Sequence, residues 1–221
     1  RIICENPSVD RRCHGPYTMM DSSRFTVEEA RNFLGLPESA SMILAFGALR
    51  DEKRLVDLVA AFQMVSSRFP DAILYIQTDA AYNPKKTRWL NMLASIPGIE
   101  LSVGYATLEK VEALFKASSF VALPYEKAAS SGVLNLARGF AKPVLLSDCF
   151  EQAEEIDGVC GYAVPVRNPP EIAKALAKLL VSDDAQLQRF QNGWDLFTHS
   201  FLQTSLSLLQ FSFFDFASIQ R

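Results

Sequence analysis

Short apolar runs alternate with amphipathic helical stripes from residue 41 to about residue 180, and no other feature of the chain constrains its fold as strongly. The runs are four to six residues long, which suits strands better than helices, and most contain no polar residue, as expected of strands buried on both faces. The predicted strands are 42–46, 72–76, 99–103, 120–123, 144–147 and 161–166. The predicted helices between them are 55–65, 89–96, 108–115, 131–140 and 172–181.

This order of elements indicates consecutive βαβ units. Such units give a parallel sheet with helices on both faces, and the usual right-handed crossovers leave few arrangements of the strands. We therefore predict an α/β fold with a doubly wound, Rossmann-like parallel sheet.

The two ends of the chain depart from this pattern. Residues 1–24 are polar and irregular, with two prolines and a glycine, and we interpret them as a linker that enters the domain at 25–200. Residues 201–221 are rich in Phe and Leu, and we interpret them as an apolar, helical tail that packs on this domain or on another one. Because the chain begins with Arg1 and a strand-like Ile2-Ile3-Cys4, we expect it to be part of a longer protein.

Composition narrows the function. The net charge of −3 argues against a nucleic-acid partner, which would need clustered Lys and Arg for phosphate contacts. The sequence contains no run of about 18 apolar residues, the length needed to span a membrane, and we expect a cytoplasmic protein. The four cysteines have no spacing typical of a zinc site, so reduced thiols are favoured, although a Cys4–Cys13 or Cys149–Cys160 disulfide stays open.

The first loop that can bind a ligand follows the predicted strand 42–46, since ligands of open parallel sheets bind beyond the carboxyl ends of strands. Gly47 permits a sharp turn, and Arg50 and Lys53 are three residues apart at the start of a helix, where both cations could reach one diphosphate. The alternative is an exposed helix start in which Arg50 and Lys53 pair with the neighbouring acids.

The second loop follows the predicted strand 120–123. Ser130 or Ser131 can cap the next helix, and Gly132 has no side chain to obstruct a phosphate oxygen near the N–H groups of Gly132 and Val133. A serine at a helix start is common and weak evidence alone. Because both loops lie at one edge of the sheet, together they predict a site for an anionic group such as a diphosphate.

A third loop, residues 147–155, follows the predicted strand 144–147 and is acidic. Its carboxylates could accept hydrogen bonds from sugar hydroxyls. They could equally cap the short helix that follows, and capping is the favoured interpretation for any one of them.

Several segments, in this order and spacing, resemble the C-terminal, donor-binding half of GT-B glycosyltransferases, in particular retaining enzymes of glycosyltransferase family 4, also called group 1. The matching segments are residues 46–53 (FGALRDEK), 123–125 (LPY), Ser131-Gly132, 142–144 (KPV), and 154–156 (EEI) with Gly158 and Gly161.

The resemblance implies that Arg50 and Lys53 neutralise the diphosphate of a nucleotide sugar and stabilise the leaving nucleotide, and are catalytic in that electrostatic sense. It implies that Gly47, Ser130, Ser131, Gly132 and Val133 contact the same donor. The donor would be a UDP-, GDP- or ADP-sugar, with no cofactor and no metal ion. The acceptor, a saccharide or a lipid-linked saccharide, would bind to an N-terminal domain that this chain lacks, and the full-length enzyme could associate peripherally with a membrane.

This sequence departs from the family pattern at the donor sugar and ribose. Many members have two glutamates eight residues apart, at positions that here are Ala128 and Leu136. Glu126 and Asn135 lie near these positions without matching them, and Glu126 is retained as a candidate donor-binding residue. Ala141 stands where the family usually has glycine. A subgroup of the family has the Ser-Gly turn without the glutamates, and this chain looks like that subgroup.

These observations predict a donor-binding domain that transfers a hexose with retention of configuration and has little activity as a fragment. A second hypothesis is a degenerate, non-catalytic domain that serves as a partner or scaffold subunit. A third, weaker one is a sugar-nucleotide epimerase, for which His14 and His199 are poorly placed in the sequence.

Overall fold

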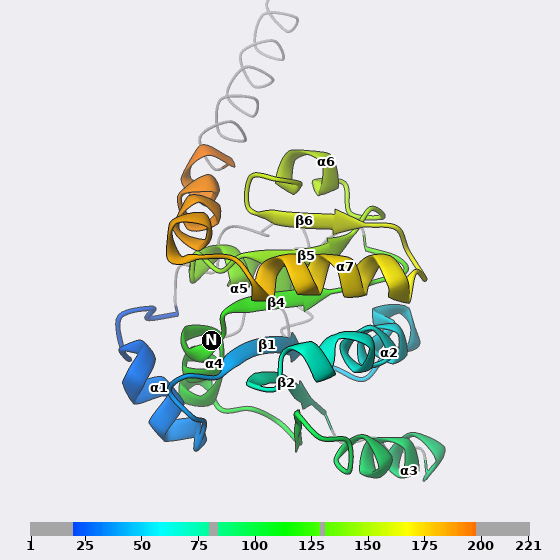
Figure 1. The fold of residues 1–221 in the computed structure, drawn as a ribbon. Helices are drawn as coiled ribbons and strands as arrows, with labels where there is room; N and C mark the ends of the chain where they lie inside the picture. Colours follow the sequence, from blue (N-terminus) through cyan, green and yellow to red (C-terminus); the bar gives the residue numbers. More distant parts are fainter. Residues whose placement is uncertain (1–19, 80–83, 129–130, 198–221) are drawn as a thin grey trace, which may run out of the picture.

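All six predicted strands form one parallel sheet in the order β3-β2-β1-β4-β5-β6 (Figure 1). The computed structural model describes residues 20–79, 84–128 and 131–197. The strands are β1 (Ser41–Phe46), β2 (Ala72–Thr78), β3 (Ile99–Val103), β4 (Phe120–Leu123), β5 (Val144–Ser147) and β6 (Gly161–Val164). This order, in which the chain winds outward in both directions from β1 and β4, confirms the doubly wound, Rossmann-like prediction.

Helices cover both faces of the sheet. Their bounds are α1 (Val27–Leu34), α2 (Leu55–Val65), α3 (Pro84–Leu93), α4 (Leu108–Ala117), α5 (Gly132–Gly139), α6 (Ala153–Ile156) and α7 (Pro169–Leu180), with short 3-10 turns η2 (Asp51–Lys53) and η3 (Ser66–Arg68). Residues 184–197 are also helical. One core layer joins α1, α4 and α5 to the sheet, and a second joins α2, α3 and α7 to its other face. Figure 1 shows α2 and α7 side by side on that second face.

The end of the predicted linker is anchored on α4. The Asp21 N–H donates to Glu112 Oε1 at 3.0 Å, and Arg24 Nε lies 2.5 Å from Glu112 Oε2. Glu112 is almost fully buried, and an unpaired carboxylate there would be costly, so Arg24 and Asp21 supply the partners it needs. Residues 1–19 of this segment, and the predicted tail at 201–221, lie outside the described residues.

The last described helix joins the two core layers. Phe190 belongs to the layer of α2 and α7, whereas Trp194 and Phe197 belong to the layer of α4 and α5. Trp194 Nε1 donates to the Lys142 carbonyl oxygen at 2.9 Å. The buried Lys142 Nζ in turn donates to the carbonyl oxygens of Lys116 (2.9 Å) and Ser118 (2.7 Å) and so caps the end of α4. Burial lowers the pKa of Lys142 to about 8.

Cys149 and Cys160 are free thiols, which agrees with the favoured prediction for this pair. Cys4 and Cys13 lie outside the described residues. Within residues 20–79, 84–128 and 131–197, none of the helices has the length and hydropathy that crossing a bilayer requires.

Ala141, in the turn between α5 and β5, adopts a left-handed backbone conformation with a φ of 49°. This conformation is strained for an alanine and free of strain for a glycine. We expect Ala141→Gly to raise the free energy of unfolding by about 0.5–1 kcal/mol, measured by urea denaturation. The same exchange at Ala177, a helical position in α7, should lower it by about 1 kcal/mol. A loss of stability in Ala141→Gly would contradict the strain argument.

Candidate functional site

The two loops singled out in the sequence meet at the centre of the sheet. Residues 47–54 follow β1 and residues 124–131 follow β4, and these two strands are neighbours at the point where the winding of the chain reverses. Doubly wound domains bind their ligands in the crevice at this point. A backbone hydrogen bond of 2.7 Å, from the Glu126 N–H to the Glu52 carbonyl oxygen, joins the two loops.

A cavity of about 470 Å³ lies between these loops and the start of α5. Such a volume is in the range of small-molecule sites. Its wall includes every described residue predicted from sequence to contact the diphosphate: Gly47, Arg50, Lys53, Ser131, Gly132 and Val133. Ser130 lies outside the described residues.

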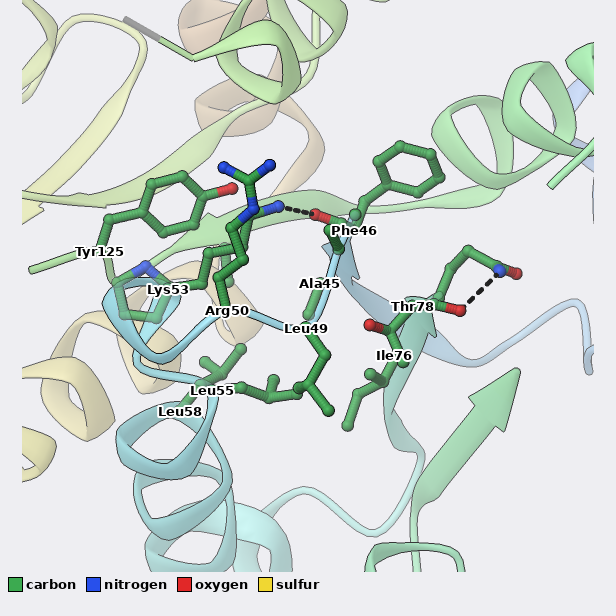
Figure 2. A pocket seen from close by; sticks show the side chains of 15 residues that line it. Ala45, Phe46, Leu49, Arg50, Lys53, Leu55, Leu58, Ile76, Thr78 and Tyr125 are labelled. Atoms are coloured by element: carbon green, nitrogen blue, oxygen red, sulfur yellow. Dashed lines mark hydrogen bonds between the residues drawn. The ribbon is translucent and has the colours of Figure 1, made fainter. Parts of the chain in front are cut away.

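Lys53 is the more buried of the two cations predicted to bind the diphosphate. Its Nζ donates to the carbonyl oxygen of Phe46 at the end of β1, at 3.2 Å (Figure 2). It also lies 5.4 Å from the centre of the Tyr125 ring. Burial, with a smaller contribution from Arg50, lowers the pKa of Lys53 to about 8, although Asp79 and Glu52 act in the opposite direction. The surrounding protein therefore compensates the charge of Lys53 only in part.

Arg50 lines the same cavity in a more open position. Its side chain is 67% exposed, and its Nη1 lies 3.8 Å from Glu52 Oε1. The alternative interpretation of this loop, an exposed helix start with ion pairs, thus describes Arg50 but not Lys53. The two cations differ in environment: Lys53 is partly desolvated and hydrogen-bonded to the backbone, whereas Arg50 is mostly exposed to solvent.

Gly47 is required by the position of Lys53. Its φ is 105°, and a Cβ built on it would lie 2.5 Å from Lys53 Nζ. The next nearest atom is Val133 Cγ2 at 3.8 Å, so Gly47 lies directly between the lysine and the start of α5. The glycine lets the backbone turn and lets the ammonium group approach it.

The start of α5 provides backbone donors. Ser131 is the N-cap, and its Oγ accepts a hydrogen bond of 3.3 Å from the Leu134 N–H. Within the described part of the chain, the Gly132 and Val133 N–H groups have no hydrogen-bond partner. Their N–H groups and the positive end of the helix dipole are suited to an anion.

Tyr125, the last residue of the LPY segment quoted for the family resemblance, was assigned no role in the site from the sequence. Its ring faces Lys53, and its hydroxyl group shares a hydrogen bond with the Ser131 side chain. Burial raises its pKa, so the phenol stays neutral. Tyr125 thus connects the cation of the first loop to the cap of α5.

Glu126 is part of an ion-pair cluster and does not line the cavity. Arg167 Nη2 donates to its Oε1 at 2.6 Å, and Arg54 Nη1 lies 4.0 Å from its Oε2. The hydrogen bond from Arg167 lowers the pKa of Glu126, so the carboxylate is charged at neutral pH.

The ends of β2 and β3 add a polar wall that sequence inspection missed. Asp79 Oδ1 accepts a hydrogen bond of 2.7 Å from the Leu49 N–H and so fixes the first loop. Gln77 is almost fully buried, and its Nε2 donates to the Gly104 carbonyl oxygen at 2.8 Å. Its Oε1 has no hydrogen-bond partner among the described residues. These residues could have been found from the sequence, because they lie at the carboxyl ends of predicted strands, on the same edge of the sheet as the two loops.

Ala128 and Leu136, the positions of the two family glutamates, both line the cavity. Both positions counted from the resemblance therefore lie at the candidate site. The surface they contribute is apolar and cannot accept hydrogen bonds from sugar or ribose hydroxyls through a side chain.

The acidic loop after β5 has a structural role where it is described. Asp148 Oδ1 accepts a hydrogen bond of 3.2 Å from the Val166 N–H. The N-cap of α6 is Gln152, whose side chain makes no capping hydrogen bond. The prediction that a carboxylate of this loop caps the short helix was wrong.

The sequence has recognisable relatives. A family model described as "Glycosyl transferases group 1" matches residues 40–182, more than half of the chain. D-inositol 3-phosphate glycosyltransferase of Corynebacterium urealyticum is 28% identical over 194 residues, which cover 85% of this chain and 45% of that protein. The chain thus spans less than half the length of this curated relative.

Solved structures share the fold. The C-terminal domain of the group 1 glycosyl transferase LpcC from Francisella tularensis has a TM-score of 0.69 at 19% identity, over 82% of this chain and 98% of that domain. A glycosyltransferase from Rickettsia africae has a TM-score of 0.67 at 16% identity, over 79% of this chain and 47% of its own. Sucrose-phosphate synthase from Thermosynechococcus elongatus has a TM-score of 0.65 at 18% identity, over 88% and 50%.

The fold is that of the C-terminal half of a GT-B glycosyltransferase. The matched residues 40–182 include all six strands and both loops of the site. The chain belongs to the glycosyl transferases group 1 family.

Proposed function

We propose that this chain is the donor-binding half of a retaining hexosyltransferase and binds a nucleotide diphosphate sugar in the 470 Å³ cavity. The observation that supports this best is the convergence of Lys53, Arg50 and the N–H groups of Gly132 and Val133, which have no partner among the described residues, on one cavity. Two cations and a helix start match the charge and the oxygen atoms of a diphosphate.

In this proposal the same groups stabilise the reaction. When the bond between the sugar and the diphosphate breaks, negative charge increases on the leaving phosphate. Lys53 and Arg50 offset that charge, and preorganised N–H groups at the start of α5 donate to the phosphate oxygens without reorganising. The counter-charge thus comes from the protein, and no metal ion is assigned to it.

The rest of the donor would occupy the remaining wall. Gln77, whose amide nitrogen is bound to the Gly104 carbonyl oxygen, contributes to this wall. Ala128 and Leu136 leave an apolar surface, so selection of the sugar would depend on backbone groups and on shape. The test below therefore uses UDP, GDP and ADP.

Transfer requires a second half in this proposal. The chain covers 45% of the curated relative. We propose that the acceptor, a saccharide or a lipid-linked saccharide, binds to the remainder of the enzyme. The alternative of a degenerate scaffold domain is not favoured, because the described site retains both cations and the helix start. The epimerase hypothesis gains no support, since His14 and His199 lie outside the described residues.

Isothermal titration calorimetry tests the proposal. The chain is titrated with UDP, GDP and ADP, and with the three corresponding nucleosides as controls. We expect at least one diphosphate to bind and its nucleoside to bind at least tenfold more weakly, because the charged contacts are made by the phosphates. Absence of binding by all three diphosphates would contradict the proposed function.

The affinity should depend on pH through Lys53. Its pKa in the free protein is about 8, and a diphosphate beside it would raise that pKa by favouring the charged form. Binding therefore takes up a proton above pH 8, and the affinity should be full below pH 8 and fall as the pH rises from 8 to about 9.5. The phosphate charge is constant in this range because phosphates ionise near pH 6. The uracil and guanine rings lose a proton at the upper end of the range, so the matching nucleoside is titrated at each pH as a control. Calorimetry from pH 7 to 9.5 measures the slope, and a flat profile would contradict the role of Lys53.

A further inference from the structure

Three loops at the carboxyl edge of the sheet converge on one carboxylate. Glu126 follows β4, Arg54 ends the turn after β1, and Arg167 follows β6. Arg167 Nη2 donates to Glu126 Oε1 at 2.6 Å, and Arg54 Nη1 lies 4.0 Å from Glu126 Oε2. The Glu126 side chain is 22% exposed and that of Arg167 is 61% exposed, so their contact lies at the surface.

Both arginines reach this carboxylate from a strained backbone. Arg54 has a φ of 50° and Arg167 a φ of 54°, and among the described non-glycine residues only Ala141 shares this conformation. Left-handed conformations are unfavourable for residues with a side chain, and they persist where the surroundings compensate for them. The common feature of the two arginines is an ion pair with Glu126.

The cluster is directly connected to the diphosphate groups. Arg54 follows Lys53 in the chain, ends η2 and is the N-cap of α2, where its guanidinium makes two hydrogen bonds to Asp57, of 2.8 and 3.0 Å. The Glu126 N–H donates to the Glu52 carbonyl oxygen. Glu126 therefore contacts the residues on both sides of Lys53, while its neighbour Tyr125 contacts Lys53 itself.

We propose that Glu126 is a positioning residue for the diphosphate site. Its carboxylate fixes Arg54 and Arg167, and thereby keeps the turn that presents Lys53 at the correct distance from the start of α5. Glu126 does not touch the donor in this account, which replaces the direct contact expected from the sequence. The inference rests on the proposed function, because it concerns the same ligand.

Glycine variants separate the side chains from the backbone. Arg167→Gly removes the guanidinium but adopts the same φ without strain, so the free energy of unfolding should be unchanged or higher. The nucleoside diphosphate that binds most tightly to the wild-type chain should nevertheless bind about tenfold more weakly, because a displaced Lys53 contacts the phosphates less well. Glu126→Gln should weaken binding similarly, and the double variant should be no weaker than either single one.

The control is Glu171→Gln, which breaks the exposed Glu171–Lys174 pair on α7 and should leave binding unchanged. Urea denaturation accompanies each titration.

Wild-type affinity in both Arg167→Gly and Glu126→Gln would overturn the inference. A loss of affinity that is matched by an equal loss in the free energy of unfolding would also overturn it. Additive losses in the double variant would also overturn it, because they would mean that Arg167 contacts the ligand independently. If the wild-type chain binds no diphosphate, the proposed function and the inference both fall, whereas wild-type binding with unaffected variants removes the inference alone.

Discussion

Lys53→Met is expected to weaken the binding of a nucleoside diphosphate about 100-fold at pH 7. Methionine keeps much of the length of the side chain and its contact with Tyr125, but it removes the partly desolvated cation from the wall of the cavity. A charge-assisted hydrogen bond to a phosphate contributes about 1.5–3 kcal/mol, and about 2.7 kcal/mol corresponds to the expected factor. Calorimetry with UDP, GDP or ADP measures the change.

The matched control is Lys174→Met, which removes an exposed lysine on α7 outside the cavity. Its affinity should equal that of the wild-type chain. Lys53→Met should also lose the decrease in affinity above pH 8, because the titrating group is gone. A Lys53→Met protein that binds the diphosphate with wild-type affinity would remove this lysine from the site.

Gly161→Ala is expected to have the largest effect on stability, a loss of about 3 kcal/mol in the free energy of unfolding. Gly161 begins β6 and pairs with Val144 of β5. A Cβ on Gly161 would lie 1.8 Å from the Val144 carbonyl oxygen, and the φ of 154° is unfavourable for alanine. Because the opposing atoms are backbone atoms of the pairing between β5 and the edge strand β6, the two strands must separate to admit the methyl group.

Gly158→Ala is the matched control. Gly158 also has a positive φ, of 74°, but a Cβ there would meet no atom within 4 Å. Gly158→Ala should therefore lower the free energy of unfolding only by the backbone strain, about 1 kcal/mol. Urea denaturation of both variants measures the difference, and equal losses would show that the close approach of Gly161 to β5 is unimportant.

The sheet could be predicted from the sequence because its strands are buried on both faces. Residues 42–46, 120–123 and 144–147 are almost continuously apolar and are almost entirely buried in the structure. The loops that separate these strands from the neighbouring helices are short, so the alternation of strands and helices was clear in the sequence. The ends of the helices were predicted less accurately. The helix predicted over residues 89–96 is α3, Pro84–Leu93, and its start was missed because its first turn is polar.

Two helices without a continuous apolar stripe were not predicted. In α1 only Ala30 is buried, so periodicity gave no signal. The capping box of Thr26 and Glu29, with hydrogen bonds of 2.7 and 3.1 Å, was the available evidence. In the helix at 184–197, Phe190, Trp194 and Phe197 are buried at helical spacing, but they contact two different core layers.

The site was partly predictable for a topological reason. Strand order makes the loops after β1 and β4 neighbours, so residue types in those loops were sufficient to propose a shared anion site. The individual environments were not predictable: Lys53 is partly desolvated while Arg50 is exposed, and Glu126 faces two arginines rather than the cavity. These differences depend on side-chain directions and on the loop after β6, which local sequence does not encode.

The diphosphate site itself is tested most directly by backbone amide chemical shifts in the ¹⁵N-labelled chain. The chain is titrated with UDP, GDP and ADP and with the matching nucleosides. The account predicts that a binding diphosphate shifts the amide signals of Gly47, Gly132 and Val133, which surround the proposed phosphate position, far more than its nucleoside does. A diphosphate that binds while these three signals stay in place would contradict it.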